Sequence, residues 1–197
     1  MNVPNSPLRR PRLQLVLLAL VFFGPVALSF WMYYGAHFHT AKLVAHGELL
    51  EPARPLPEAR LGTPSGTPTA ARFMRGKWSL VVLTGEHCGA TCAKDIADMR
   101  NVRLAMDRER DRVQRVLLGE PPCCAAGEVG AESDLIVAWV DSLDGRRLLA
   151  LFPARAEAGR VYVVDPLGNL VMSYAAGADR KGLIKDLEKL LRLSHIG

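Results

Sequence analysis

Two of the four cysteines of this 197-residue chain, Cys88 and Cys92, are separated by three residues. A thiolate is both the nucleophile of thiol–disulfide exchange and a ligand for soft metal ions. A thioredoxin-type redox pair has two intervening residues. The wider loop here can still close a disulfide, and it also lets both sulfurs hold one ion of low coordination number, for which Cu(I) is the natural candidate. The alternative is a pair of buried cysteines with a structural role only.

The residues around the pair predict where it lies. The run Trp78–Leu83 is short, apolar and β-branched, and it ends at Thr84–Gly85, so it predicts a buried strand. Beyond Cys92, apolar residues recur at helical spacing and predict a helix. The cysteines therefore stand where a strand leads into a helix N-terminus, whose unpaired N–H groups and dipole favour a thiolate.

The other two cysteines are adjacent, at Cys123 and Cys124, in a proline-containing loop after the apolar run Arg112–Leu118. A helix joins this run to Trp78–Leu83, so the two strands are expected to be parallel neighbours. Their loops then leave the same edge of the sheet, where α/β proteins gather functional residues. We expect Cys123 or Cys124 to come within disulfide or ligand reach of Cys88, the alternative being that the pair is incidental.

The N-terminal part of the chain predicts a membrane anchor. Residues 13–34 carry no charge and are long enough to span a bilayer as a helix, with three arginines before them and aromatic residues at the far end. This pattern favours a retained anchor over a cleaved signal peptide and places the N-terminus in the cytoplasm. The expected divisions are a cytoplasmic tail at 1–12, the span at 13–34, a tether and extended lead-in at 35–68, and one domain at 69–197.

Charge excludes one class of function. The net charge of +5 owes much to the basic residues before the span, and the rest of the chain is nearly balanced. No basic surface with interleaved aromatics is evident, so a nucleic-acid partner is not expected. Three histidines just after the span, His37, His39 and His46, are interpreted as solvated side chains in preference to metal ligands.

The rest of the domain predicts alternating helices and strands. We expect a helix at Leu135–Leu143, a strand or turn at Arg147–Phe152, a hairpin of Val161–Val164 with Leu170–Tyr174, and a final amphipathic helix after Asp179. Together with the cysteine strand and helix, this order predicts an α/β fold of thioredoxin type.

Several segments resemble the Sco/SenC family. They are Gly47–Pro57, Arg75–Trp78, His87–Cys88 with Cys92, and Val161–Asn169 (VYVVDPLGN), in this order over most of residues 47–193. The resemblance implies a membrane-anchored, thioredoxin-like protein that supplies copper, or reduces thiols, for the binuclear copper centre of cytochrome c oxidase. It would make Cys88 and Cys92 the copper-binding thiols, and the oxidase subunit carrying that centre the partner.

The chain also departs from the family pattern. Gly89 and Ala93 follow the cysteines where the family has prolines, and no histidine stands before Val161, where the family has its third copper ligand. Cys123 and Cys124 occupy a shortened loop that the family pattern does not explain. We therefore expect Cu(I) to be bound more tightly than Cu(II), with Cys123 and Cys124 as additional candidate ligands.

The expected function is assistance to cytochrome c oxidase assembly from a bacterial inner membrane, with the domain in the periplasm. One alternative is a general thiol–disulfide oxidoreductase of exported proteins, so the sequence leaves open whether the protein is an enzyme. A second alternative is a structural assembly partner that does not use its thiols. Copper binding would distinguish the assembly function from both alternatives. The reduction potential would then distinguish the oxidoreductase from the structural partner.

Overall fold

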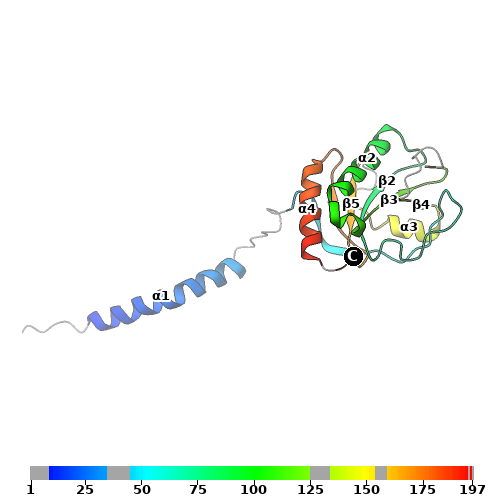
Figure 1. Ribbon diagram of the computed structural model, residues 1–197. Coiled ribbons are helices and arrows are strands. Elements are labelled where there is room, and N and C mark those ends of the chain that lie inside the picture. Colours follow the sequence, from blue (N-terminus) through cyan, green and yellow to red (C-terminus); the bar gives the residue numbers. More distant parts are fainter. Residues whose placement is uncertain (1–8, 35–44, 125–133, 154–158, 195, 197) are drawn as a thin grey trace, which may run out of the picture. The chain divides into compact units, whose positions relative to one another are not determined.

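The structure is a computed structural model that describes residues 9–34, 45–124, 134–153, 159–194 and 196. The chain divides into two units, residues 1–43 and 44–197, which are described separately. The first unit contains the helix α1 (Arg9–Tyr34), in blue in Figure 1. Within it, Leu13–Met32 has a mean hydropathy of 2.3 and is long and apolar enough to cross a membrane. Residues 1–8 of the predicted tail and residues 35–44 of the predicted tether, which include His37 and His39, lie outside the described residues.

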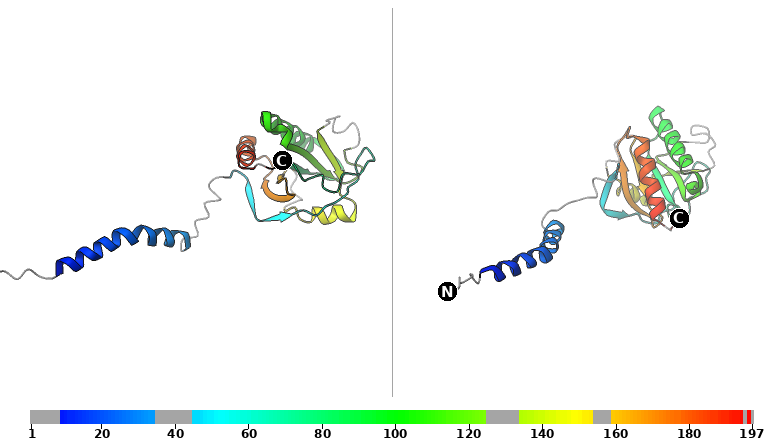
Figure 2. Two further views of the ribbon diagram at one scale, coloured as in Figure 1. Left: turned by 60° about the horizontal axis from the view of Figure 1, so that its bottom comes forward. Right: turned by 60° about the vertical axis from the view of Figure 1, so that its left-hand side comes forward.

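The second unit is built on one six-stranded sheet with the order β1-β6-β5-β2-β3-β4. Figures 1 and 2 show this sheet with its helices. The strands are β1 (Glu48–Pro55), β2 (Trp78–Leu83), β3 (Val113–Gly119), β4 (Leu135–Trp139), β5 (Val161–Val164) and β6 (Asn169–Tyr174). The helices are α2 (Ala90–Ala105), the 3-10 helix η2 (Asp107–Arg112), α3 (Leu143–Leu149) and α4 (Arg180–Leu193).

The sheet separates two hydrophobic cores. Successive side chains of a strand point to opposite faces, so Leu80 and Val82 of β2 pack in one core and Val81 in the other. The first core takes the apolar faces of α2 and α4, and the second takes Leu148 of α3 and residues of the lead-in. The central strand is thus covered on both faces, which explains its unbroken apolar sequence.

The pairing confirms the expected parallel arrangement of the cysteine strand. β2 runs parallel to β3, with Trp78 opposite Val113 and Leu83 opposite Leu118, and β3 runs parallel to β4. β5 and β6 form the predicted antiparallel hairpin, and β5 pairs antiparallel with β2. The C-terminal ends of β2 and β3 therefore meet the N-terminal end of β5 at one edge.

Between Leu135 and Phe152, one prediction was wrong and a second was correct only for its last three residues. Leu135–Leu143 was expected to be a helix, but its first part is the strand β4 and the helix α3 begins only at Leu143. Arg147–Phe152 was expected to be a strand or turn, but its first residues complete α3 and the rest are turn. A strand that joins a parallel ladder has a continuous apolar sequence, which lacks the alternation that would separate it from a short buried helix.

The structure adds a strand, β1, within the range expected to be tether and lead-in. β1 pairs antiparallel with β6 at the outer edge of the sheet. Just before it, the backbone N–H groups of His46 and Gly47 donate to Asp186 of α4, at 2.7 and 3.1 Å. The Tyr174 hydroxyl donates to the same carboxylate at 2.8 Å. Asp186 therefore fastens the start of the second unit to α4 and β6.

The last helix begins as predicted. Asp179 caps α4, and its side chain accepts a hydrogen bond from the Lys181 N–H at 3.0 Å. Leu183, Leu187 and Leu191 on one side of α4 are buried in the core shared with α2. α4 therefore covers the same face of the sheet as the helix that follows the cysteines.

Candidate functional site

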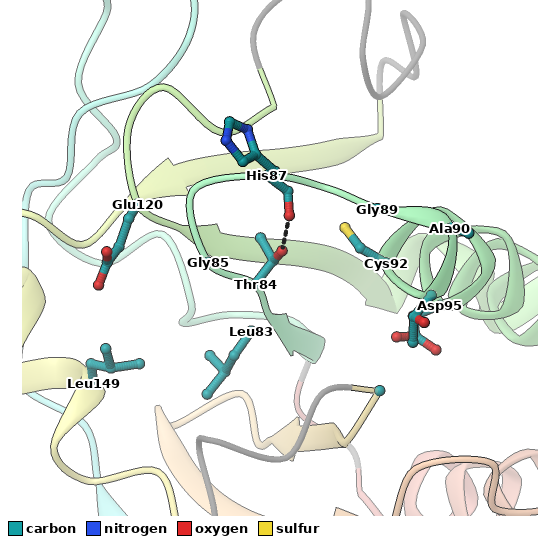
Figure 3. A pocket seen from close by; sticks show the side chains of 12 residues that line it. Leu83, Thr84, Gly85, His87, Gly89, Ala90, Cys92, Asp95, Glu120 and Leu149 are labelled. Carbon is teal, nitrogen blue, oxygen red and sulfur yellow. Dashed lines mark hydrogen bonds between the residues drawn. The ribbon is translucent and has the colours of Figure 1, made fainter.

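A disulfide joins Cys88, in the loop between β2 and α2, to Cys92 in the first turn of α2, with their Cα atoms 5.1 Å apart. Backbone bonds tie the loop to the end of β3, since the Thr84 N–H donates to the Leu118 carbonyl at 2.9 Å. The Thr84 hydroxyl donates to the His87 carbonyl at 3.2 Å, which closes the turn directly before Cys88 (Figure 3). The first cysteine is thus held by the loop and the second by the helix.

The two sulfurs differ in environment. Cys88 is half-buried, whereas Cys92 lies in the first turn of α2 and is only 8% exposed. Gly89 caps this helix without a side-chain bond, and the first turn contains no acidic residue. The amide groups of that turn therefore present their positive end to the sulfurs, which lowers the free energy of a thiolate. An incoming thiolate has better access to Cys88.

A pocket of about 560 Å³ opens beside the disulfide. Cys92 and Asp95 of α2 form one wall, and Glu120, which follows β3, contributes to another (Figure 3). Gly159, just before β5, and Leu149 of α3 complete it. The pocket lies at the sheet edge where the strand ends meet, as the sequence predicted for the cysteine loop.

An ion pair between a buried arginine and a partly exposed aspartate positions the cysteine helix. Arg115 of β3 is completely buried, and its Nη2 and Nε donate to the two carboxylate oxygens of Asp134, at 2.6 and 3.3 Å. Its Nη1 donates to the Ile96 carbonyl of α2 at 3.3 Å. Burial raises the pKa of Asp134, but the hydrogen bond and charge of Arg115 and the charge of Arg103 outweigh it and hold the pKa below its usual value.

The adjacent cysteines, Cys123 and Cys124, form a second disulfide with each other. Both are almost inaccessible, at 0% and 3% exposure, and the Trp139 indole donates to the Cys123 carbonyl at 3.0 Å. They belong to the same core as Cys92, and Cys88 packs against that core. Their loop leaves β3 at the edge of the sheet that also carries the Cys88 loop. That Cys123 or Cys124 comes within disulfide or ligand reach of Cys88 stays a prediction.

The donor set suits a soft, low-coordinate ion once the disulfide is reduced. Cys88 and Cys92 then supply two thiolates, which is sufficient for Cu(I). Among the described residues, no three His, Cys, Asp or Glu side chains form a group that could hold a metal ion. Gly159 stands next to the cysteine helix, where a Cβ would lie 3.5 Å from both Asp95 Oδ2 and Thr91 Cγ2, and it brings no ligand. His46 instead contacts Asp186, with Nδ1 3.0 Å from Oδ1.

Two polar residues of the site were missed from the sequence. Asp95 is buried at 8% exposure, and its Oδ2 has no hydrogen-bond partner in the described part of the chain. The available signal was its spacing, since Asp95 falls on the same helix face as Cys92, Ile96 and Met99. Arg115 was missed because its apolar strand gave no hint of a distant carboxylate partner.

A thioredoxin-like fold with a disulfide at a helix N-terminus defines a class of thiol proteins, and the family comparison agrees with it. The family described as "Transmembrane-like, thioredoxin-like, C-terminal domain" matches residues 78–194, more than half of the chain. A companion family, "Transmembrane-like, N-terminal domain", matches residues 7–36. The chain therefore belongs to the transmembrane-like, thioredoxin-like family. No curated protein matches it by sequence.

Solved structures of Sco proteins share the fold. The apo Sco1 protein from Thermus thermophilus has a TM-score of 0.58 and 17% identity, covering 74% of this chain and 96% of its own. Copper-bound Sco1 from yeast has a TM-score of 0.57 and 12% identity, with coverage of 72% and 93%. Copper-bound ScoI from Arabidopsis thaliana has a TM-score of 0.55 and 14% identity, and the match covers 76% of this chain and 100% of that one. The expected resemblance to Sco/SenC proteins is confirmed as a likeness of fold.

Proposed function

We propose that this protein is a membrane-anchored thiol protein that handles Cu(I), or reduces thiols, during assembly of the copper centre of cytochrome c oxidase. The observation that carries the proposal is the Cys88–Cys92 disulfide at the N-terminus of α2, open to a pocket at the sheet edge. Its helix end favours thiolates, and two thiolates are the minimal donor set for Cu(I). The copper-bound Sco structures of the same fold add support.

In this proposal, reduction of the disulfide comes first. A thiolate of a dithiol partner attacks the more accessible Cys88 and forms a mixed disulfide, which releases Cys92. The second thiol of the partner then attacks its own sulfur in the mixed disulfide, so that the partner is oxidised to a disulfide and Cys88 and Cys92 are left as thiols. The reduced pair either accepts Cu(I) as cargo or passes its electrons to a disulfide of the client. The client is the oxidase subunit that carries the binuclear copper centre, as the Sco/SenC resemblance implies.

Copper stoichiometry tests the proposal. The full chain, reduced in a mild detergent, should bind one Cu(I) against a competing chromophoric chelator. Cys88→Ser or Cys92→Ser should each abolish tight binding, because one thiolate cannot complete a two-coordinate site. Cu(II) should bind more weakly, without a strong thiolate-to-copper charge-transfer band. Wild-type affinity in both single variants would refute the Cu(I) site.

We also propose that reduced Cys123 or Cys124 contributes a further thiolate or resolves the Cys88 disulfide. The support is that both cysteine loops leave neighbouring parallel strands at one edge and pack on one core. A Cys123→Ser/Cys124→Ser double variant should then change the copper affinity or the reduction potential of Cys88–Cys92. If the copper affinity and the reduction potential are both unchanged, the second disulfide has a purely structural role.

A second candidate function is general thiol–disulfide exchange on exported proteins. It is favoured by Gly159, which offers no third ligand next to the cysteine helix. Equilibration of the full chain with glutathione buffers gives the reduction potential of Cys88–Cys92. A defined potential without Cu(I) binding would support the oxidoreductase. If the chain shows neither Cu(I) binding nor a defined reduction potential, only the role of a structural assembly partner remains.

A further inference from the structure

The outward side of α4 carries a row of basic side chains. Lys181, Lys185 and Lys189 follow one another at intervals of four residues, and Arg192 comes three residues later. A helix turns by about 100° per residue, so this spacing puts the four side chains of this basic row on one side of α4. All four are exposed, and Figure 2 shows α4, in red, on the outside of the second unit. The opposite side of α4 carries the leucines that pack in the core.

No acidic partner neutralises the basic row. None of its four side chains forms an ion pair with a residue in the described part of the chain. Arg180, at the start of α4, differs from them because it pairs with Asp98 at 2.8 Å. Of the two acidic residues of α4, Asp186 is buried and Glu188 is exposed. The basic row therefore brings four positive charges to the surface against the single negative charge of Glu188.

The helix gains no stability from this arrangement. Like charges four residues apart on a helix repel each other, so the three lysines destabilise α4. Lys181 also lies in the first turn, where the helix dipole disfavours a positive charge, and that turn contains no acidic residue. The buried leucines and the Asp179 cap already account for the helix. An anionic ligand outside the domain explains the basic row better than folding does.

The tether enters the domain beside the same helix. The His46 N–H donates to Asp186 of α4 at 2.7 Å, and a Cβ on Gly182 would lie 2.7 Å from the His46 Cβ. Residues 35–45 separate His46 from Tyr34, the last residue of α1. An extended chain covers about 3.5 Å per residue, so this segment spans at most about 40 Å in any conformation. A chain anchored by α1 therefore keeps α4 within reach of the bilayer surface.

Exposed apolar residues stand at the end of the basic row. Leu193 and Ile196 follow Arg192 and are 67% and 53% exposed. The Arg112 Nη2 donates to the Ser194 and Ile196 carbonyls, at 2.6 and 3.1 Å, and holds this end of the chain on the domain. Lysine and arginine beside exposed apolar side chains are typical of a helix that lies on a bilayer. The cations bind phosphates there, and the apolar side chains enter the headgroup region. This composition favours a lipid surface over an acidic protein.

We propose that the basic row of α4 binds anionic lipid headgroups of the membrane that anchors the chain. Each basic residue near an anionic surface strengthens binding by about fivefold, and the anchor raises the effective concentration of the lipid. The basic row does not line the disulfide pocket, so lipid binding and the pocket use different parts of the domain. The inference rests on the membrane anchor and is independent of the thiol chemistry proposed above.

The test is the acylation of Lys189 by an uncharged amine reagent in the full chain, reconstituted in lipid vesicles. Lys77, which is exposed just before β2, is the internal reference. Peptide mass spectrometry measures the labelling of Lys189 relative to Lys77. This ratio should be about fivefold lower in vesicles that contain phosphatidylglycerol than in vesicles of pure phosphatidylcholine. About 0.5 M salt should restore it, because salt screens contacts between exposed charges.

A variant of α4 removes the rest of the basic row and keeps Lys189 as the reporter. It carries Lys181→Gln, Lys185→Gln and Arg192→Gln, all at exposed positions. In this variant, Lys189 should be labelled equally in the two kinds of vesicle, because one remaining cation binds the anionic surface weakly. The salt dependence of the wild-type chain tests the same charge pairing without any substitution.

A matched variant removes the same amount of charge outside α4. It carries Arg60→Gln, Arg108→Gln and Arg110→Gln, which replace exposed arginines without an ion pair among the described residues. Its net charge equals that of the α4 variant. Lys189 should keep its wild-type protection on phosphatidylglycerol, because the contact depends on the basic row and not on total charge.

Each other outcome would overturn the proposal. Equal labelling of wild-type Lys189 in the two kinds of vesicle would exclude the lipid contact. Protection that persists in the α4 variant, or that salt does not weaken, would report a contact other than charge pairing. Protection found in native membranes and absent from lipid vesicles would indicate an acidic protein partner instead. A chain that alkaline carbonate washes from the vesicles would overturn the anchor and this inference with it. None of these results would alter the proposed chemistry of Cys88 and Cys92.

Discussion

At the scale of single residues, the two sulfurs of the Cys88–Cys92 disulfide differ in access. Cys88 is half-buried in a loop, whereas Cys92 is 8% exposed within a helix. After reduction, we expect a small alkylating reagent to modify Cys88 about ten times faster than Cys92, because thiol reactivity follows exposure and thiolate fraction. Peptide mass spectrometry after timed alkylation measures the ratio. The chain unfolded in urea is the control and should show nearly equal rates.

The burial of Asp95, whose Oδ2 has no hydrogen-bond partner among the described residues, implies a cost in stability. Asp95→Asn should raise the free energy of unfolding at neutral pH by about 1 kcal/mol, because it removes a buried, unpartnered carboxylate. The pKa of Asp95 is raised in the folded chain, so wild type loses stability as pH rises from the unfolded pKa through the folded one. The gain in the variant should therefore vanish in acid. Urea unfolding at several pH values measures the gain in the variant. An equal gain at all pH values would contradict the argument that the ionised Asp95 carboxylate lowers the stability of wild type.

Single residues also show what sequence reasoning can find. The place of Cys88 and Cys92 between a strand and a helix N-terminus was predicted correctly, because the strand and helix patterns are local features. Asp95 was missed because its burial depends on what covers α2, although its position on the apolar helix face was visible. Arg115 and Asp134 lie on different segments, and only the pairing of β3 with β4 brings them together.

At the scale of elements, the buried Arg115, paired with Asp134, connects the cysteine helix α2 to the sheet. Asp134→Ala should destabilise the chain by about 3 kcal/mol, because it leaves the completely buried Arg115 without its carboxylate partner. Urea unfolding of the full chain measures the loss. Asp144→Ala is a matched control, since Asp144 pairs with Arg147 only at the exposed surface, at 3.5 Å, and should cost little. Equal costs would show that the Arg115–Asp134 pair contributes no more to stability than the surface pair.

Most elements could be predicted where local signals bound them. β2 ends at a turn, β5 and β6 enclose a turn sequence, and Asp179 caps α4, so each has a boundary in the sequence itself. β4 has an apolar sequence without alternation, and its state is decided by pairing with β3. β1 contains prolines and is mostly exposed, and only its pairing with β6 makes it a strand. The missed elements are therefore those that depend on distant partners.

At the scale of the whole molecule, stability should fall in acid. Burial raises the pKa of Asp186, but hydrogen bonds from His46, Tyr174 and the backbone outweigh it, so the pKa of Asp186 lies below its usual value. Its stabilisation is present above the unfolded pKa, near 4, and is lost as pH falls through the folded pKa. Asp186→Asn should cost about 3 kcal/mol at neutral pH and make unfolding less sensitive to acid. Urea unfolding between about pH 7 and pH 2 measures both effects. An acid response identical to that of wild type would contradict this role.

The orientation in the membrane is a further prediction at this scale. The arginines before the span and the aromatics after it predict that the domain lies on the exported side, which in a bacterium is the periplasm. A reporter that is active only after export, fused after Gly197, should be active. Replacing Arg9, Arg10 and Arg12 with glutamine should weaken this bias. Activity of a cytoplasm-only reporter in the unchanged fusion would reverse the orientation and the oxidising compartment assumed for the disulfides.

The outer strand β1 has a consequence for molecules that share a membrane. Proteins confined to a plane meet more often than in solution, and an unpaired strand edge is a template for joining two sheets. β1 carries Pro52 and Pro55, which have no N–H to donate, and the charged residues Glu48, Glu51 and Arg54. Such an edge resists edge-to-edge association. We therefore expect these domains to stay separate at high density in the bilayer, with the disulfide pocket of each one left open.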